Sequence, residues 1–299
     1  MGYIGRFAPS PTGPLHFGSL AAALASYLDA KAHDGKWLVR IEDIDETRCD
    51  PMYAADILRT LQAFEMQWDG DVEIQSRRKT LYDAALQKLR SSGLIYACVC
   101  SRKEIADSAL AGIEGPVYPG TCRQSVNTEQ GNALRVRTSN DNISFMDHVQ
   151  GYREQRIESD IGDFVVRRRD GLFAYQFAVT VDDADQRVTH VVRGADLLDS
   201  TARQIHLQRS LGYPTPEYLH IPVAVNAHGQ KLSKQTLATA VSNAEDQRRG
   251  VLLSALLFLG QSIAATENAR TMVELIATAT QEWRRGIIPH MRSKAMDPD

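Results

Sequence analysis

Apolar and polar residues follow the periods of an α/β protein from the start of the chain. Residues 3–7 form a short, largely apolar stretch that predicts a strand, and three prolines within residues 8–14 predict a rigid loop after it. Apolar residues then recur at helical spacing over residues 20–28, and residues 37–41 predict a second strand. A strand, a helix and a strand in this order form a βαβ unit with parallel strands. The pattern therefore predicts an open α/β sheet.

The same periods predict further elements along the rest of the chain, with an irregular middle part that is rich in Gly, Pro and Ser. In chain order we expect helices at 53–64 and 78–91, strands at 163–168, 175–181 and 187–192, a helix at 200–211, a strand at 219–225, and helices at 250–259 and 271–283.

Composition excludes several classes of protein. A chain of 299 residues with 43% hydrophobic and 24% charged residues is long enough and apolar enough for a packed core, unlike a disordered or fibrous protein. Its most apolar run, residues 251–259, is much shorter than the roughly 20 residues of a membrane span. The first residues lack the features of an export signal, so we expect a cytoplasmic protein without membrane contact. With a net charge of -3, contact with a nucleic acid would need a local basic face.

The loop before the first predicted helix has the features of a phosphate site. His16, Gly18 and Ser19 lie where a strand leads into a helix, and the first N–H groups of a helix have no partner within the helix. Gly18 would let a nucleotide approach the backbone, and His16 could donate a hydrogen bond to a phosphate oxygen. A surface histidine before a helix is the simpler alternative for so short a motif.

Three of the four cysteines are candidates for a structural zinc site. Cys98 and Cys100 are separated by one residue, and Cys122 follows after a loop, so their thiolates could hold one tetrahedral ion with a fourth donor. His148 and Asp107 are generic candidates for that donor. Buried cysteines without a metal are the alternative, and zinc is favoured because it would stabilise a segment that is poor in apolar residues.

Longer motifs connect these features to one family. Residues 6–18, Arg-Phe-Ala-Pro-Ser-Pro-Thr-Gly-Pro-Leu-His-Phe-Gly, closely resemble the opening of glutamyl-tRNA synthetases, which are class I aminoacyl-tRNA synthetases with a Rossmann catalytic fold. Residues 231–235, Lys-Leu-Ser-Lys-Gln, resemble the second ATP-binding signature of that class. The segments at 40–45, 162–167, 177–183 and 192–194 follow in the order of the family.

The resemblance implies an α/β fold with a Rossmann-type parallel sheet. Residues 1–95 would form the first half of the catalytic domain, 96–160 a zinc-containing insertion, 161–240 the second half with the lysine loop, and 241–299 a small C-terminal helical part without an anticodon-binding domain.

The resemblance also implies a reaction and a site. The carboxylate of glutamate attacks the α-phosphorus of ATP, with magnesium on the nucleotide, and an acyl-adenylate forms as pyrophosphate leaves. The residues implied in catalysis are His16, Gly18 and Lys234. Those implied in binding ATP are His16, Gly18, Ser19, Lys231, Ser233 and Lys234, and those in binding L-glutamate are Arg6, Ala8, Ser10, Glu42, Tyr175 and Arg193. In a variant of the family, a tyrosine that corresponds to Tyr118 completes the zinc ligands Cys98, Cys100 and Cys122.

Two departures from the glutamyl-tRNA synthetase pattern concern the RNA substrate. The part after the lysine loop is much shorter than the family's anticodon-reading part, and Ala195 and Leu197 replace the usual acidic residue and histidine. Both fit shortened paralogues in the family, which activate glutamate without tRNA and transfer it to the queuosine base in the anticodon loop of tRNA(Asp). The alternatives are a truncated enzyme that charges the 3′ end of tRNA and a non-catalytic RNA-binding paralogue.

Overall fold

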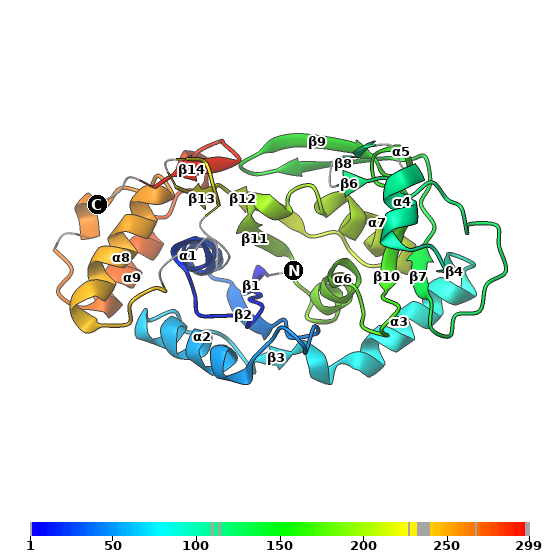
Figure 1. Ribbon diagram of the computed structural model, residues 1–299. Helices are drawn as coiled ribbons and strands as arrows, with labels where there is room; N and C mark the ends of the chain where they lie inside the picture. Colours follow the sequence, from blue (N-terminus) through cyan, green and yellow to red (C-terminus); the bar gives the residue numbers. More distant parts are fainter. Residues whose placement is uncertain are drawn as a thin grey trace.

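A parallel sheet at the centre of the molecule places the ends of its strands around one site. The computed structural model describes residues 2–108, 111–112, 115–226, 228–231, 240–266 and 268–296. β1 (Ile4–Phe7) pairs in parallel with β2 (Lys36–Ile41), which pairs with β3 (Glu73–Ile74). On its other side β1 contacts β11 (His190–Gly194), which pairs in parallel with β12 (Glu217–Ile221). The expected α/β sheet is confirmed (Figure 1).

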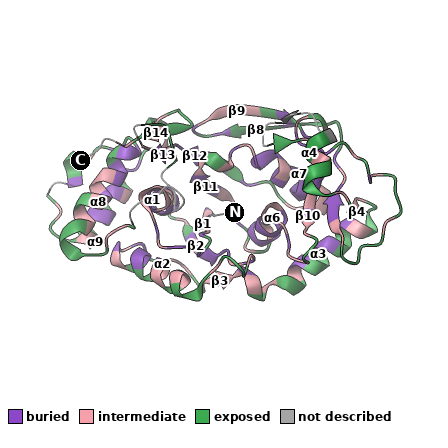
Figure 2. Cartoon of the chain, viewed as in Figure 1, coloured by how far each residue is buried: buried purple, intermediate pink, exposed green. Residues whose placement is uncertain are grey.

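The helix α1 (Phe17–Lys31) connects β1 to β2 and packs against β1 and β11. Its apolar side, with Leu20, Leu24 and Leu28, is completely buried. α1 also contacts α8 (Glu245–Phe258) and α9 (Met272–Gln281), the two expected helices of the C-terminal part. The first helix of the βαβ unit is therefore a central element, between the sheet and the C-terminal helices, as the buried residues in Figure 2 show.

One predicted element has the wrong type. Residues 175–181 were expected to form a strand, but they begin the helix α6 (Tyr175–Asp185). Phe177, Ala178 and Val181 are buried at helical spacing in the second core cluster of the protein. The strand prediction rested on the run of β-branched residues here, and packing in the tertiary structure overrides such a preference.

The middle of the chain contributes two small sheet regions. β4 (Ile95–Cys98), β7 (Ala133–Val136) and β10 (Phe164–Arg167) form an antiparallel sheet. The hairpin of β8 (Asn142–Asp147) and β9 (Gly151–Arg156) instead joins the central sheet, because Asp147 of β8 pairs with Tyr218 of β12. The range expected to form an insertion, residues 96–160, thus contains a hairpin that extends the central sheet.

The remaining elements complete the chain. They are α2 (Pro51–Ala63), α3 (Lys79–Ser91), α4 (Arg102–Ser108), α5 (Ile157–Asp160), α7 (Thr201–Leu211), the short strands β5 (Ala111–Gly112), β6 (Gly115–Pro116), β13 (Val223–Val225) and β14 (Ser293–Ala295), and 3-10 turns at Gln75–Arg77, Ala195–Leu197, Ala264–Thr266 and Arg285–Ile287. β14, which was not expected, pairs in parallel with β13 and returns the end of the chain to the sheet. Among the described residues, no helix has the length and apolar character to cross a membrane.

Candidate active site

A cavity of about 290 Å³ opens at the carboxyl ends of β1 and β11 and at the start of α1. In parallel α/β sheets, ligands bind in this position. Most of the predicted site residues line it, namely Arg6, Ala8, Ser10, His16, Gly18, Ser19, Tyr175, Arg193 and Lys231. Glu42 is buried beside this group, whereas Ser233 and Lys234 lie outside the described residues. The structure therefore brings residues from distant parts of the sequence to one place.

His16 organises the start of α1. Its Nδ1 accepts a hydrogen bond from the backbone N–H of Ser19 at 3.3 Å, and its Nε2 lies 3.0 Å from the Ser19 hydroxyl. Because Nδ1 is an acceptor, a neutral His16 carries its proton on Nε2. Gly18 has no side chain to cover this turn, and a Cβ there would be 3.4 Å from the His16 ring. The helix start is thus open to the cavity, with an N–H donor on the histidine.

Both ends of the lysine loop lie next to this helix start. Lys231 lines the cavity, and its ammonium group contacts Asp196 at 2.5 Å. At the other end, Ala240 forms an isolated bridge with His16, and the N–H of Val241 donates to the carbonyl of Leu15. The described ends of the segment that carries the second predicted ATP-binding motif, Lys231 and Ala240, therefore lie close to the first motif.

A buried group of guanidinium and carboxylate side chains lies below the cavity. Asp183 accepts hydrogen bonds from Arg6 Nε at 3.2 Å and from Arg40 Nη2 at 2.8 Å, and Arg40 also donates to Glu42 at 3.1 Å. Burial by itself would raise the pKa of Asp183, but Arg6 and Arg40 outweigh it and hold that pKa below its usual range. Asp183 is thus a charged partner for both arginines.

The carboxyl group of Glu42 has a different environment. Burial raises the pKa of Glu42 to about 7, although Arg40 and Arg6 oppose the shift and Asp183 adds to it. Near neutral pH, the Glu42 carboxyl group is therefore only partly ionised, and a bound cation would favour loss of its proton. Tyr175, at the start of α6, stays protonated because burial and Glu42 raise its pKa to about 12.

Arg193 approaches the cavity from the end of β11. Its Nε donates to His220 Nε2 at 2.9 Å, and one Nη2 hydrogen bond goes to the Thr201 hydroxyl at 3.0 Å. Its Nη1 is buried and has no hydrogen-bond partner within the described residues. A buried guanidinium N–H without a partner is costly, and since Arg193 also lines the cavity, this nitrogen is a candidate donor for a carboxylate ligand.

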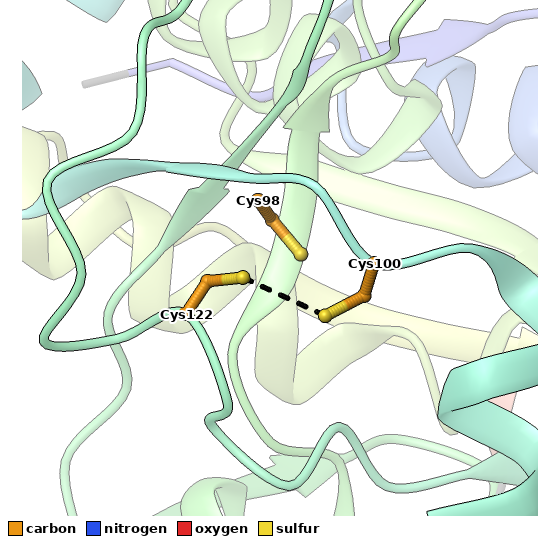
Figure 3. Close-up of side chains that lie close together, drawn as sticks. All are labelled: Cys98, Cys100 and Cys122. Atoms are coloured by element: carbon orange, nitrogen blue, oxygen red, sulfur yellow. Dashed lines mark hydrogen bonds between the residues drawn. The ribbon is translucent and has the colours of Figure 1, made fainter.

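The cysteine cluster lies away from the cavity, at the end of β4 and in the segment between β4 and β7. The sulfur atoms of Cys98, Cys100 and Cys122 all lie within 4.8 Å of one another, and their side chains point toward a common centre (Figure 3). The Tyr118 hydroxyl is 3.4 Å from the sulfur of Cys98 and 3.7 Å from that of Cys100. A group of this composition can hold a metal ion.

Neither generic candidate for the fourth ligand belongs to this cluster. His148 contacts Glu217 at 2.7 Å, and Asp107 is exposed on α4. Of the candidates, Tyr118 alone places an oxygen among the sulfurs.

Sequence reasoning missed the residues that support Arg193. Asp147, Thr201 and His220 are isolated in the sequence, and the pairing of β8 with β12 brings the first and last of them together. Tyr218 and His220 are two residues apart on β12, so their side chains lie on the same face of the strand; this spacing from an aromatic residue is the only sequence signal that His220 faces the interior. Leu197, which departs from the family pattern, lines the cavity, and Ala195 is buried beside it.

Comparisons of the sequence and the fold with known proteins show the family to which the chain belongs. Residues 4–297 match the family of class I tRNA synthetases (E and Q), catalytic domain. The fold is similar to that of a glutamate tRNA ligase from Elizabethkingia meningosepticum, solved in complex with its amino acid, with a TM-score of 0.80 and 24% identity over 99% of this chain and 67% of that one. A glutamate-tRNA synthetase from Elizabethkingia anophelis gives a TM-score of 0.79. The chain belongs to the class I tRNA synthetase family for glutamate and glutamine.

Curated relatives show which members of this family the chain is similar to over nearly its whole length. A glutamyl-Q tRNA(Asp) synthetase from Dechloromonas aromatica is 53% identical over 290 residues, with 96% of each chain covered. The protein of the same name from Burkholderia cenocepacia is 52% identical over 294 residues, which are 96% of this chain and 98% of the relative. The resemblance to the shortened paralogues is therefore confirmed at the level of sequence.

Proposed function

We propose that this chain activates L-glutamate with ATP in the absence of tRNA and then transfers the glutamyl group to the queuosine base in the anticodon of tRNA(Asp). The observation that carries the proposal is the cavity at the carboxyl ends of β1 and β11. It is lined by the start of α1 and by Arg193, whose buried Nη1 has no partner among the residues that the structure describes. The names of relatives that are half identical to this chain over nearly their whole length support the same activity.

The glutamate site combines complementary charges. Arg6 and Arg193 both line the cavity and would bind the side-chain carboxylate of glutamate: Arg6 uses Nε and Nη2 for Asp183, and Nη1 of Arg193 has no partner among the described residues. Glu42 would receive the substrate ammonium. Ala8, Ser10 and Tyr175 would complete the contacts with the amino acid.

The nucleotide site lies at the start of α1. The helix N-terminus and the Nε2–H of His16 would hold the phosphates, with Gly18 and Ser19 at the closest approach. Lys231, Ser233 and Lys234 belong to the loop that would neutralise the charge on the leaving pyrophosphate, with magnesium bound to the nucleotide. The protein's contribution is to position the two substrates and to neutralise the phosphate charge, because the reaction needs no covalent enzyme intermediate.

For the cysteine cluster we propose a structural zinc ion held by Cys98, Cys100, Cys122 and Tyr118. Three thiol groups and a phenol converge there, and thiolates are preferred ligands of zinc. The ion would stabilise the loop between β4 and β7.

The second step needs a hydroxyl group next to the adenylate. Once the mixed anhydride exists, a hydroxyl of the cyclopentene diol of queuosine can attack its carbonyl carbon and AMP leaves. An anticodon loop can present such a base because it is single-stranded.

Labelled glutamate and ATP, incubated with tRNA(Asp) that contains or lacks queuosine, test the proposal. We expect label only on the queuosine-containing tRNA, and the label should disappear when periodate has oxidised the diol. Labelling of queuosine-free tRNA(Asp) would instead indicate charging of the 3′ end, the first alternative. Absence of glutamate-dependent ATP–pyrophosphate exchange would favour a non-catalytic RNA-binding protein.

A further inference from the structure

Arg193 is the end of a buried chain of hydrogen bonds that begins on the β8–β9 hairpin. Asp147 Oδ2 lies 2.6 Å from His220 Nδ1, and His220 Nε2 accepts from Arg193 Nε at 2.9 Å. His220 is completely buried, Asp147 is 2% exposed and Arg193 is 5% exposed. Water therefore does not compete for these bonds.

The directions of these hydrogen bonds follow from the donors. An arginine has no acceptor, so His220 Nε2 must be unprotonated to accept from Arg193. The ring proton is then on Nδ1, where it donates to Asp147. Burial lowers the pKa of His220 to about 4, so the ring is neutral at physiological pH. The Thr201 hydroxyl, 3.4 Å from Nε2, is consistent with the same tautomer.

The carboxylate of Asp147 is itself fixed. Its Oδ1 accepts hydrogen bonds from the backbone N–H groups of Val149 at 3.0 Å and Gln150 at 2.7 Å, in the turn between β8 and β9. Oδ2 is thereby aimed at His220. At the other end of the chain, Thr201 takes one hydrogen bond from Arg193 Nη2. The guanidinium plane is thus held at Nε and Nη2, and Nη1 is left for a ligand.

We propose that Asp147 and His220 are positioning residues for glutamate: Asp147 selects the Nδ1-protonated form of His220, and that form orients Arg193 toward the substrate carboxylate. The inference rests on the proposed function, because it takes the ligand of Arg193 to be glutamate. Neither residue touches the substrate. Their contribution is to keep the guanidinium group in one orientation before the substrate binds.

Two substitutions at His220 separate this role from a purely structural one. In H220Q the amide lies near the position of Nε2 and can still accept from Arg193, whereas in H220N it lies near Nδ1 and can satisfy only Asp147. If His220 orients Arg193, H220N should raise the KM for glutamate by about tenfold or more, and H220Q should raise it less. Both should leave the KM for ATP unchanged in ATP–pyrophosphate exchange.

Asp147→Asn tests the tautomer with almost no change in shape. The amide oxygen can keep the backbone hydrogen bonds, while the amide NH₂ would donate to Nδ1 and move the ring proton to Nε2, against the Arg193 donor. We expect a higher KM for glutamate with an unchanged KM for ATP. Nitrogen NMR of the histidine side chains should show the Nδ1-protonated form in the wild type and its loss in D147N, and this measurement does not depend on activity.

His206 supplies the matched control, because it is a buried histidine on α7 that contacts the carbonyl of Arg137 and does not line the cavity. H206Q and H206N should leave the KM for glutamate unchanged. Equal effects of H220Q and H220N, a smaller effect of H220N, or an Nε2-protonated ring in the wild type would overturn the inference. If the wild type shows no glutamate-dependent exchange, the proposed function itself fails, while the tautomer measurement still tests the hydrogen-bond chain.

Discussion

The ionisation of Glu42 should make the affinity for glutamate depend on pH. Its pKa is raised to about 7 by burial, so near neutral pH the empty site holds a mixture of charged and neutral carboxyl groups. A substrate ammonium favours the charged form, and by linkage glutamate must bind more tightly as the carboxyl group loses its proton.

We therefore expect the KM for glutamate to fall as pH rises through about 7 and to level off above it. Exchange kinetics from pH 5.5 to 8.5 would measure this profile. In Glu42→Gln, which keeps the shape but cannot titrate, the bend should vanish and the KM should be high at every pH. If the KM for glutamate of this variant still changed near pH 7, the pH dependence would have to come from a group other than Glu42.

Lys234 is the residue whose charge the proposed chemistry needs most directly. We expect Lys234→Ala to lower the rate of ATP–pyrophosphate exchange by more than about 100-fold, because an ammonium group on the departing phosphates stabilises charge that develops in the transition state. Circular dichroism and the Tm should match the wild type. Lys103→Ala, at an exposed lysine of α4, is the control and should exchange normally. Normal exchange in Lys234→Ala would remove the residue from the mechanism.

The predictability of the site depends on how its residues are distributed along the chain. His16, Gly18 and Arg6 lie in one continuous motif, so the sequence was sufficient to group them, and the cavity brings them together. Asp147 and His220 are single residues that no motif marks. Their roles depend on the register between β8 and β12, which is set by the packing of the whole sheet rather than by any local pattern.

At the scale of elements, the segment between β4 and β7 has little apolar core of its own. The buried residues of the small cluster that it forms with the end of β4 are Tyr96, Cys98, Tyr118 and Cys122, so the proposed zinc ligands make up most of it. If the proposed zinc ion is bound there, it would supply much of the free energy that holds this segment in a single folded conformation.

We expect Cys98→Ser to lose stoichiometric zinc and to increase hydrogen exchange between residues 98 and 122, while α1 keeps its protection. Metal analysis together with hydrogen-exchange mass spectrometry would measure both effects. Cys49→Ser is the matched control, since Cys49 lies outside the cluster, and it should retain the metal. A metal-free wild-type protein with full protection in this segment would contradict the zinc proposal.

The elements of the fold were predictable where a single period was strong. The helices over 53–64, 78–91 and 200–211 match α2, α3 and α7 closely, because their apolar residues repeat at helical spacing. The run Ala178 to Val181 in α6 is short, apolar and partly β-branched, which is typical of a strand, so its pattern does not predict the helix. β14 has only three residues and gains its conformation from pairing with β13, so it left no sequence signal.

At the scale of the whole molecule, one buried carboxylate ties the C-terminal part to the catalytic core. Asp29 of α1 accepts hydrogen bonds from Tyr3, from the indole of Trp283 at 2.9 Å and from Arg285 Nη2 at 2.9 Å. Its side chain is 1% exposed. The guanidinium group of Arg285 is thus engaged by a carboxylate of α1, and this pair joins the C-terminal part to the core.

Removal of Arg285 should lower the free energy of unfolding, because the charged Asp29 would remain buried without its guanidinium partner. Burial alone would raise the pKa of Asp29, and the hydrogen bonds from Arg285, Tyr3 and Trp283 reverse this and lower the pKa below its ordinary value. In Arg285→Ala the charge of the carboxylate loses its main partner, and breaking a buried pair in this way costs about 3 kcal/mol of unfolding free energy. The pKa of Asp29 should then rise above its value in the unfolded chain, so the variant regains stability as pH falls through that raised pKa.

The deficit relative to the wild type should therefore be larger at pH 8 than at pH 5 in urea unfolding followed by tryptophan fluorescence. Arg284→Ala is the control, because that neighbouring side chain is 61% exposed, and it should be close to neutral at both pH values. A deficit of equal size at pH 5 and pH 8 would mean that Asp29 is not held as a charged partner. Since Asp29 also lies on the helix whose start forms the proposed nucleotide site, the same variant should lose ATP–pyrophosphate exchange at a lower urea concentration than the wild type.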